Sequence, residues 1–541
     1  GESPERTRPA KDFILAFGER VAEGDPAKVE YWVEVNLAKL NEEFLEALPK
    51  VFTQLTTGKY SSKQEQNAAL FGNFANFIQK TPLGNRALNL ELSLAVYQLT
   101  LKVFTRKDFP ENWARTQNNL GTVYSNRIRE ERADNLEQAI QHYESALLIR
   151  TRDAFPENWA RTQNNLGIVC SDRIRGERAD NLEQAIQYYE IALLISTRDA
   201  FPKNWADTQN NLGIIHSDRI RGERADNLEQ AIQYYESALL ISTRDAFPEN
   251  WAMTQHNLAN AYRNSYTGEN LETLNLAIST YQKAAQVFTP TAYPYKCSEN
   301  QSQWAEALFK RATHTSISTH KPEDLSSSIT LLTEALEVSP TGSPNYIDSH
   351  YRLGNALSLR YQITKNSTDL DQALAAYKTA LDAIDPEHYD RNKIWQALPT
   401  TQSVLGSRLV RDGQWQDGLQ LLLNSVSQLR NSDDRLTHAS ALFETGRAYE
   451  TLSDWDNARI YYRDALRFYT HLNNQSGMAK SLAGLGTTLG AQGYLEKSMA
   501  TLQQARDLYE ELRQPEKITE VDNLYKIAER TLAEQDIEIF L

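Results

Sequence analysis

Residues 159–204 read WARTQNNLGIVCSDRIRGERADNLEQAIQYYEIALLISTRDAFPKN, and residues 205–250 repeat this stretch with differences at five of 46 positions. The same spacing separates four tryptophans, namely Trp113, Trp159, Trp205 and Trp251. A period of this length is typical of repeat arrays, in which small units stack against their neighbours and bury a continuous core. We therefore expect a stack of repeats, and we expect these tryptophans to pack between neighbouring repeats.

Each repeat predicts two helices. The first begins after Phe155-Pro156, because proline suits the first helical turn and Glu157 suits the positive end of the helix dipole. The second begins at Asp180, with Glu183 as its capping-box partner. The apolar residues expected to face the core are Trp159, Leu166, Ile168, Cys170 and Ile174 in the first helix, and Leu182, Ala185, Ile186, Tyr189, Ala192 and Leu193 in the second.

The array extends in both directions from these repeats. A diverged repeat is expected at 67–112, and Gly354, Gly406, Gly446 and Gly486 mark later ones. The register around Trp304 stays open, and the broken spacing near Pro290 and Pro294 predicts a bend within 251–350. We expect about ten repeats, in five segments: a helical cap or docking segment at 1–66, 46-residue repeats at 67–290, irregular repeats at 291–394, repeats of about 40 residues at 395–514, and a capping helix at 515–541.

Composition narrows the class of function. The chain has 541 residues, 40 % of them hydrophobic, and a net charge of −14, so a general nucleic-acid surface is not expected. No apolar run reaches 18 residues, which predicts no membrane span, and two cysteines exclude a disulfide framework or a CxxC zinc cluster. With no signal peptide visible, we expect a cytoplasmic protein without cofactor or metal.

Catalytic patterns are weak. Cys170 and His216 suggest a nucleophile and base, but they occupy the same position of adjacent repeats, where the preceding repeat has Tyr124, so we interpret both as core residues. The arginine- and acid-rich links around Arg127, Arg129 and Arg132 predict ion pairs on a solvated ridge, with a phosphate or acidic-partner site as the alternative. We therefore expect a protein that is not an enzyme.

The repeat resembles the tetratricopeptide repeat, a unit of 34 residues with small residues at positions eight, 20 and 27. With Gly121 at position eight, Leu120 falls at seven, Tyr124 at 11, and Ala139, Tyr143 and Ala146 fall at 20, 24 and 27 after a six-residue insertion. Six further residues between repeats account for the 46-residue period. The resemblance implies an all-α, TPR-type α-solenoid, a superhelix of helix–turn–helix repeats with capping helices at both ends.

In this family the first helix of each repeat lines the concave groove, and the resemblance implies a binding role for its positions two, five, nine, 12 and 13. Carried onto this chain, position two gives Arg115, Arg161, Asp207 and Met253; position five gives Asn118, Asn164, Asn210 and His256; position 12 gives Ser125, Ser171, Ser217 and Arg263; and position 13 gives Asn126, Asp172, Asp218 and Asn264.

The asparagines at position five suggest how a groove could hold a peptide. An amide donates and accepts hydrogen bonds, so it can bind the backbone of an extended chain without reading its sequence. Alternatively, these asparagines are duplicated solvent-facing residues. The change from Arg161 to Asp207 would contribute specificity. Tyr351 and Phe443, at position five of later repeats, would be aromatic anchors or would pack against a neighbouring repeat.

A closer resemblance rests on residues 82–121, PLGNRALNLELSLAVYQLTLKVFTRKDFPENWARTQNNLG, and on 172–186, DRIRGERADNLEQAI. These stretches resemble the sensor arrays of cyanobacterial multi-domain tetratricopeptide proteins, many of which carry a caspase-like CHAT protease domain. The resemblance covers roughly residues 25–290, and we expect no such domain within residues 291–541.

Two functions remain open. The first is a non-catalytic scaffold or adaptor whose groove binds a protein or peptide. The second is a regulatory sensor that controls a CHAT-type protease or another effector in a different chain or segment.

Overall fold

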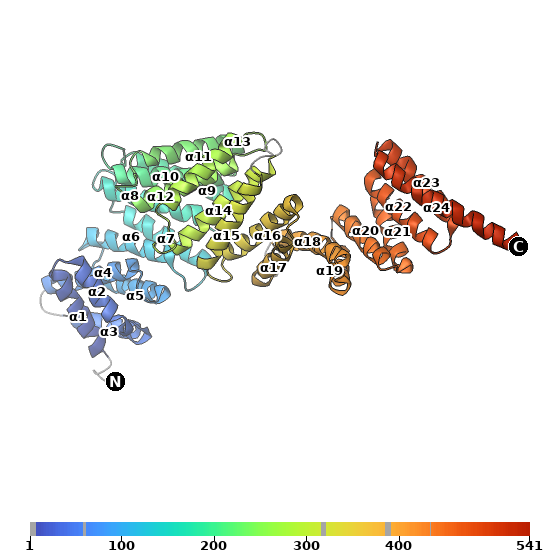
Figure 1. Ribbon diagram of the computed structural model, residues 1–541. Coiled ribbons are helices and arrows are strands. Elements are labelled where there is room, and N and C mark those ends of the chain that lie inside the picture. The colour runs from blue at the N-terminus through green and yellow to red at the C-terminus, as the bar shows by residue number, and fades with distance from the viewer. Residues whose placement is uncertain (1–6, 58–60, 315–320, 385–390, 433, 541) are drawn as a thin grey trace. The chain divides into compact units, whose positions relative to one another are not determined.

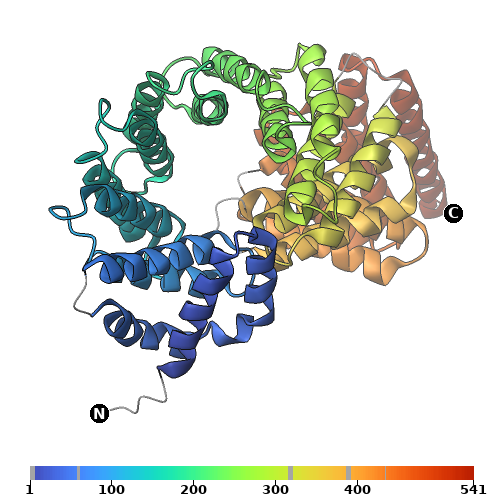
Figure 2. The same cartoon turned by 90° about the vertical axis from the view of Figure 1, so that its left-hand side faces the viewer.

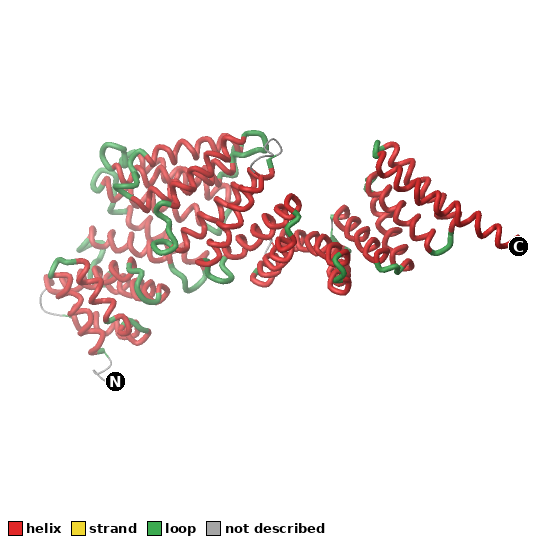
Figure 3. Tube along the Cα trace, viewed as in Figure 1, coloured by secondary structure: helices red, strands yellow, loops and turns green. Residues whose placement is uncertain are grey.

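The structure is a computed structural model that describes residues 7–57, 61–314, 321–384, 391–432 and 434–540. All regular structure in these ranges is helical, as Figure 3 shows. The chain divides into two compact parts, Gly1–Thr267 and Gly268–Leu541, which we call the N-terminal unit and the C-terminal unit. The predicted all-α solenoid of paired helices is confirmed in each of them.

The N-terminal unit begins with three helices outside the repeat pattern and continues with paired helices (Figure 1). The helices are α1 (Arg8–Ala22), α2 (Pro26–Val35), η2 (Leu37–Lys39), α3 (Glu42–Thr56), α4 (Ser61–Lys80), α5 (Arg86–Thr100), α6 (Pro110–Asn126), α7 (Arg132–Leu147), α8 (Pro156–Asp172), α9 (Arg178–Leu193), α10 (Pro202–Asp218), α11 (Arg224–Leu239) and α12 (Pro248–Asn264).

The C-terminal unit continues the pattern and ends on a single long helix (Figure 1). Its helices are α13 (Leu271–Ala285), α14 (Pro294–Thr313), α15 (Lys321–Val338), α16 (Pro344–Thr364), α17 (Ser367–Ala383), α18 (Arg391–Arg411), α19 (Trp415–Leu429), α20 (Arg435–Thr451), α21 (Trp455–His471), α22 (Gln475–Ala491), α23 (Leu495–Glu511) and α24 (Pro515–Phe540).

Proline sets the start of the first helix in each 46-residue repeat. The residue before each proline has the same non-helical backbone, with φ −140° at Phe155 and −142° at Phe247. Tyr293 has φ −142° and precedes Pro294, the first residue of α14, at the same 46-residue spacing. The interpretation of Pro294 as a break in spacing was therefore wrong, and the register around Trp304 follows directly from the preceding repeats.

The second helix begins earlier than the capping pattern predicts. In α9 the N-cap is Glu177, whose side chain makes no capping hydrogen bond, and the helix starts at Arg178. Asp180 lies in the first turn and pairs with Arg221 of the next repeat, and Glu183 pairs with Arg219. The expected capping box was wrong because both carboxylates bind arginines across the joint between repeats.

A glycine lets the two helices of a repeat approach closely. A Cβ atom on Gly213 would lie 2.5 Å from Cε1 of Tyr235, whose side chain is 2 % exposed. The ring therefore occupies the volume of the missing side chain, and the same pairing recurs between Gly121 and Tyr143. This contact explains why small residues at position eight face aromatics at position 24.

The segment before the repeats has no continuous helix from Val29 to Leu40. Its helix α2 ends at Val35, which is 66 % exposed, and a 3-10 turn follows. The core here consists of aromatic side chains instead, since Phe13 contacts both Phe44 and Phe74 with ring centroids 5.3 and 6.0 Å apart. Asn36 is the C-terminal cap of α2, and its side-chain amide donates a hydrogen bond of 2.8 Å to the Trp32 carbonyl.

Arginine–glutamate pairs join consecutive repeats of the N-terminal unit. Arg173 donates two hydrogen bonds of 2.8 Å to Glu137, and Arg219 does the same to Glu183. These bonds hold the pKa of both glutamates below its ordinary value. The predicted ion pairs in the links are therefore present, and they connect neighbouring repeats rather than lying along one ridge.

We expect Arg219→Ala to lower the free energy of unfolding of α9–α11 by about 1–2 kcal/mol, because it removes two charge-assisted hydrogen bonds and leaves Glu183 without its partner. Hydrogen–deuterium exchange across these helices measures the change. Arg198→Ala, at an exposed link position, is the matched control. Equal exchange in the two variants would contradict a structural role for the pair.

The first helices of the repeats lie on the inner side of the array. Within the N-terminal unit α6 contacts α8, α8 contacts α10 and α10 contacts α12, whereas successive second helices make no contact of similar extent between described residues. An array whose first helices approach each other more closely than its second helices curves toward the first helices, and Figure 2 shows this curved succession. We call this surface the first-helix face.

Candidate functional site

The residues expected to bind a partner lie on the first helices α6, α8, α10 and α12, and on α16 and α20 of the C-terminal unit. Their exposure varies. Exposed are Arg115, Asn126, Arg161, Asp172, Asp218 and Asn264; half-buried are Ser125, Asn164, Ser171, Asp207, Asn210, Ser217, Met253, Arg263, Tyr351 and Phe443; and buried are Asn118 and His256.

The asparagines at position five bond to the next repeat. The Oδ1 atom of Asn118 lies 3.1 Å from the Thr162 hydroxyl, which also donates to the Asn158 carbonyl at 2.8 Å. The Oδ1 atom of Asn164 lies 3.2 Å from the Thr208 hydroxyl, which also donates to the Asn204 carbonyl at 2.8 Å, and that of Asn210 accepts a hydrogen bond of 3.3 Å from the amide of Asn257. Separate contacts of this kind thus link α6 to α8, α8 to α10 and α10 to α12, and we call these three asparagines the amide ladder.

The amide ladder uses one end of each asparagine. In the described chain, the side-chain hydrogen bonds of Asn118, Asn164 and Asn210 all involve Oδ1. None of their Nδ2 atoms is among the buried polar atoms that lack a partner. Each amide nitrogen therefore has no hydrogen-bond partner within the described chain and is not fully enclosed, although Asn118 as a whole is buried and Asn164 and Asn210 are half-buried.

The side chain at position two of the repeat changes from positive to negative along the first-helix face. Arg115 and Arg161 are exposed and donate hydrogen bonds of 2.9 and 2.6 Å to Asn112 and Asn158, respectively. Asp207, in the next repeat, accepts a hydrogen bond of 2.8 Å from Asn250. Burial raises the pKa of Asp207, and this hydrogen bond and nearby Lys203 oppose that rise. The face is thus positive at α6 and α8 and acidic at α10.

Positions 12 and 13 serve mainly local contacts. The hydroxyls of Ser125 and Ser171 donate to carbonyls of their own helices, and the Asn126 amide donates to the Thr122 carbonyl. Asp172 pairs with Arg132 of the preceding repeat at 3.4 Å. Burial raises the pKa of Asp218, although Arg178 and Arg224 oppose this. These side chains border the first-helix face, and their binding role stays a prediction.

The last first helix of the N-terminal unit, α12, has a different set of side chains. The Nε2 atom of His256 lies 3.0 Å from the amide nitrogen of Asn260, and Arg263 donates a hydrogen bond of 3.3 Å to Asn264. Met253 takes the place of the charged residues at position two. The face is therefore less charged at α12 than at α8.

The two predicted aromatic anchors make contacts within the C-terminal unit. The Tyr351 ring lies 6.1 Å from that of Tyr377, and the Phe443 ring lies 5.5 Å from that of Tyr462. The Lys480 ammonium sits 4.4 Å from the centre of the Phe443 ring. Both side chains are half-buried, so each combines packing with some exposed ring surface.

A cavity of about 380 Å³ lies between the first helices α18 and α20 of the C-terminal unit. It has hydroxyl groups from Ser403, Ser407 and Ser440 and the guanidinium groups of Arg411 and Arg447 in its lining. Arg447 pairs with Glu444 at 2.6 Å, and Ser407 donates to the same carboxylate. Our prediction missed these residues, although Ser403 and Arg411 occupy positions five and 13 when Gly406 is placed at eight.

Two isoleucines at position nine were also missed. Ile168 is 40 % exposed and Ile214 is 37 % exposed, although we expected Ile168 in the core. Ile174 is likewise exposed, at 58 %. Ile168 lies about 200° around the helix from the buried Leu166, so helical spacing and position nine of the repeat both place it away from the core.

The cysteine and histidine at position 11 are core residues, as predicted. Burial raises the pKa of the Cys170 thiol to about 12, so the reactive thiolate is disfavoured. Burial also lowers the pKa of His216 to about 4, with repulsion from Arg219 as a second cause. The two side chains come from different repeats and each contacts its own second helix, where His216 lies 5.1 Å from the Tyr234 ring.

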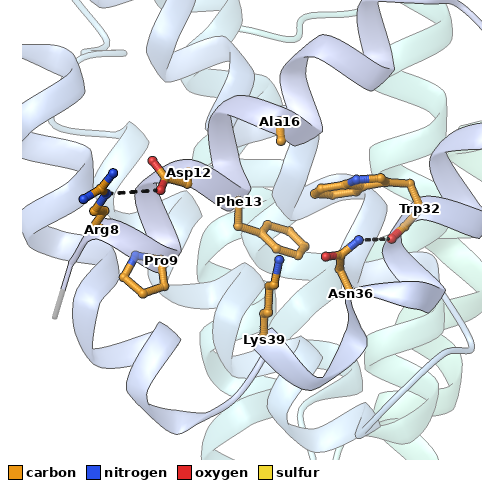
Figure 4. Close-up of a pocket in the computed structure, with 8 residues that line it drawn as sticks. All are labelled: Arg8, Pro9, Asp12, Phe13, Ala16, Trp32, Asn36 and Lys39. Carbon is orange, nitrogen blue, oxygen red and sulfur yellow. Dashed lines mark hydrogen bonds and ion pairs between the residues drawn. The ribbon is translucent and has the colours of Figure 1, made fainter. Parts of the chain in front are cut away.

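A second cavity, of about 570 Å³, opens between α1, α2 and η2 in the segment before the repeats. Figure 4 shows the Phe13 and Trp32 rings at its centre, with centroids 4.8 Å apart, and Arg8 and Asp12 to one side. The other lining residues are Pro9, Ala16, Asn36 and Lys39. This cavity lies away from the first-helix face.

In the ranges that the structure describes, no three His, Cys, Asp or Glu side chains come together in a way that could hold a metal ion. None of the described helices is both long enough and apolar enough to cross a membrane.

Comparisons with known proteins agree with the fold. Family models described as tetratricopeptide repeat match residues 205–242 and 398–471, so the chain contains tetratricopeptide repeats. No curated protein matches the chain in sequence.

Among solved structures, the chain is similar to the TPR2AB domain of yeast Sti1 in complex with pHSP90, at 16 % identity and a TM-score of 0.22, covering 60 % of this chain and 98 % of that one. It is also similar to the apo quorum sensor NprR of B. thuringiensis, at 12 % identity and a TM-score of 0.31, covering 79 % of this chain and 99 % of that one. A STAND protein with a tetratricopeptide repeat sensor from Pyrococcus horikoshii matches at 12 % identity and a TM-score of 0.33, covering 92 % of this chain and 85 % of that one.

Proposed function

We propose that this array of tetratricopeptide repeats is a non-catalytic scaffold that binds an extended polypeptide on its first-helix face. The amide ladder is the observation that carries the proposal. The next repeat occupies the oxygens of Asn118, Asn164 and Asn210, so the side chains are fixed in place while their amide nitrogens stay available.

Fixed donors suit the backbone of a bound peptide. Each Nδ2 group can donate to a carbonyl of the partner without any ion being desolvated. Because the asparagines are already ordered by hydrogen bonds, binding costs little side-chain entropy. The exposed Ile168 and Ile214 lie on the same helices and would add apolar contact area between the donors.

The change from asparagine to aspartate tests this use of the amide nitrogens. In the triple variant Asn118→Asp, Asn164→Asp and Asn210→Asp, the oxygen that accepts from the next repeat is kept and the donor is replaced by an acceptor. We expect peptides selected on the wild-type protein from a random display library to bind this variant at least tenfold more weakly, since three donors become charged acceptors facing carbonyls. Fluorescence polarisation measures the affinities.

The matched control carries the same charge change in the same three repeats on the second helices. It combines Gln141→Glu, Gln187→Glu and Gln233→Glu, all at exposed positions. We expect it to bind like the wild type, with circular dichroism and thermal melting confirming that both variants are folded. Equal weakening in the two triple variants would mean that charge alone matters, and unchanged binding in the aspartate variant would place the peptide elsewhere.

A further inference from the structure

Arg150 is a buried arginine that the fold does not require. It follows α7 in the link to α8 and is 5 % exposed. At the same position of the next two repeats the chain has Ser196 and Ser242, also buried, and the following 46-residue step reaches Phe288. A serine or a phenylalanine therefore fills this position equally well, so packing does not explain the arginine.

The guanidinium group of Arg150 lacks an anionic partner. Its one recorded side-chain hydrogen bond, within the described chain, runs from Nη1 to the hydroxyl of Thr162 at 3.5 Å, although a guanidinium has five N–H donors. Burial, together with repulsion from Arg161 and Arg115, lowers the pKa of Arg150 to about 10, and Glu111 opposes this. A buried charge of this kind is costly unless something pairs with it.

Thr162 connects Arg150 to the amide ladder. The same hydroxyl that meets Arg150 lies 3.1 Å from Oδ1 of Asn118. The charge therefore lies where α6 meets α8, beside the donors described above.

Two more arginines add to this charge. Arg115 and Arg161 hydrogen-bond to neutral asparagine side chains of their own helices, and neither pairs with a carboxylate of the described chain. Glu111 is the acidic group whose charge acts on Arg150. Arginines thus outnumber carboxylates among the groups that act on Arg150, and an acidic residue, Asp207, stands at position two of the next repeat.

We propose that Arg115, Arg150 and Arg161 form an anion site that takes a doubly charged group of the bound polypeptide. This proposal rests on the peptide-binding function proposed above and names what the peptide carries. Guanidinium groups bind both carboxylates and phosphates through paired hydrogen bonds. The group is therefore either a phosphorylated side chain or two adjacent acidic side chains, and both place about two negative charges against the cluster.

Arg150→Ser is the variant that isolates the site, because the next two repeats carry serine at this position and fold with it. Arg152→Ser removes the same charge two residues away, at an exposed position, and is the matched control. The first probe is inorganic phosphate, titrated into each protein and followed by ³¹P NMR. We expect the dissociation constant of the Arg150→Ser protein to be about tenfold higher than that of the wild type and of the control. Equal constants in all three proteins would overturn the anion site.

The second probe is a set of three synthetic peptides, built on a sequence selected from the display library, with a phosphoserine, two adjacent glutamates or two glutamines at its acidic position. We expect the first two to bind more tightly than the third, with that difference lost in Arg150→Ser, and the tighter of the two identifies the source of the charge. Selected peptides that carry no acidic position, yet still depend on the amide ladder, would overturn the anion site and leave the peptide-binding function intact. Phosphate binding that depends on Arg150, with no peptide selected, would support the anion site and contradict the function.

Discussion

Gly213→Val is expected to lower the free energy of unfolding of the N-terminal unit by about 3 kcal/mol, because it forces a branched side chain into space that the Tyr235 ring already fills. The added Cβ would lie 2.5 Å from the ring, well inside van der Waals contact. The ring cannot move away easily, since it is buried against Leu258 and Ala261 of the next repeat. Hydrogen–deuterium exchange of α10 and α11 measures the loss.

A double-mutant cycle shows whether glycine and tyrosine act as a pair. Tyr235→Ala alone is expected to cost about 3–5 kcal/mol through the cavity that it creates. In the double variant the valine occupies part of that cavity, so the combined cost should be clearly less than the sum of the two. Ala259, which stands at position eight of the next repeat, shows that one methyl group can be accommodated there. Additive costs would mean that Gly213 is small for another reason.

Acid is expected to destabilise the N-terminal unit through His216, by about 2–3 kcal/mol between pH 6.5 and pH 4. Burial lowers the pKa of His216 in the folded protein to about 4, whereas an unfolded chain has the ordinary value of about 6.5. Between these values the unfolded chain binds more protons, so the free energy of unfolding falls as the pH falls. The Nδ1 atom of His216 is buried without a hydrogen-bond partner, so its protonation is not compensated.

The preceding repeat supplies the variant that tests this. His216→Cys introduces the residue found at position 170, and His216→Tyr introduces the residue found at 124. Both variants should lose stability less steeply than the wild type as the pH is lowered from 6.5 to 4, as seen in thermal midpoints and in the exchange of α10. The comparison rests on slopes, so a constant cost of either substitution does not affect it. Parallel slopes would show that other groups cause the acid sensitivity.

The repeat period was enough to predict most of the fold. Proline at the start of α6, α8, α10 and α12 and the small residues at position eight follow from sequence alone, because both depend on local backbone geometry. Counting 46 residues on from Phe247-Pro248 would have reached Tyr293-Pro294. Tyrosine replaces phenylalanine there, and Trp304 replaces the leucine usual at position seven, so the register of this repeat was not recognised.

What sequence could not supply were contacts between repeats. Glu183 has the spacing of a capping box, and only its position opposite Arg219 shows that it binds across the joint. Ile168 and Leu166 are both apolar, but they lie about 200° apart around α8, so only Leu166 faces the core. The burial of Arg150 could not be predicted from the sequence. Comparison with Ser196 and Ser242, at the same position of the next two repeats, would nevertheless have shown that an arginine is unusual there.

The joint between repeats has a consequence for the evolution of this chain. Around residues 159–204 its bonds link the same residue types at both ends of the repeat: arginine with glutamate, and threonine with asparagine. If residues 159–204 were lost, Arg219 would meet Glu137 and Thr208 would meet Asn118, and no bond would lack its complement. Duplication would work in the same way. The gene can therefore change the number of repeats in whole steps, and with it the length of the first-helix face, without a new interface between repeats.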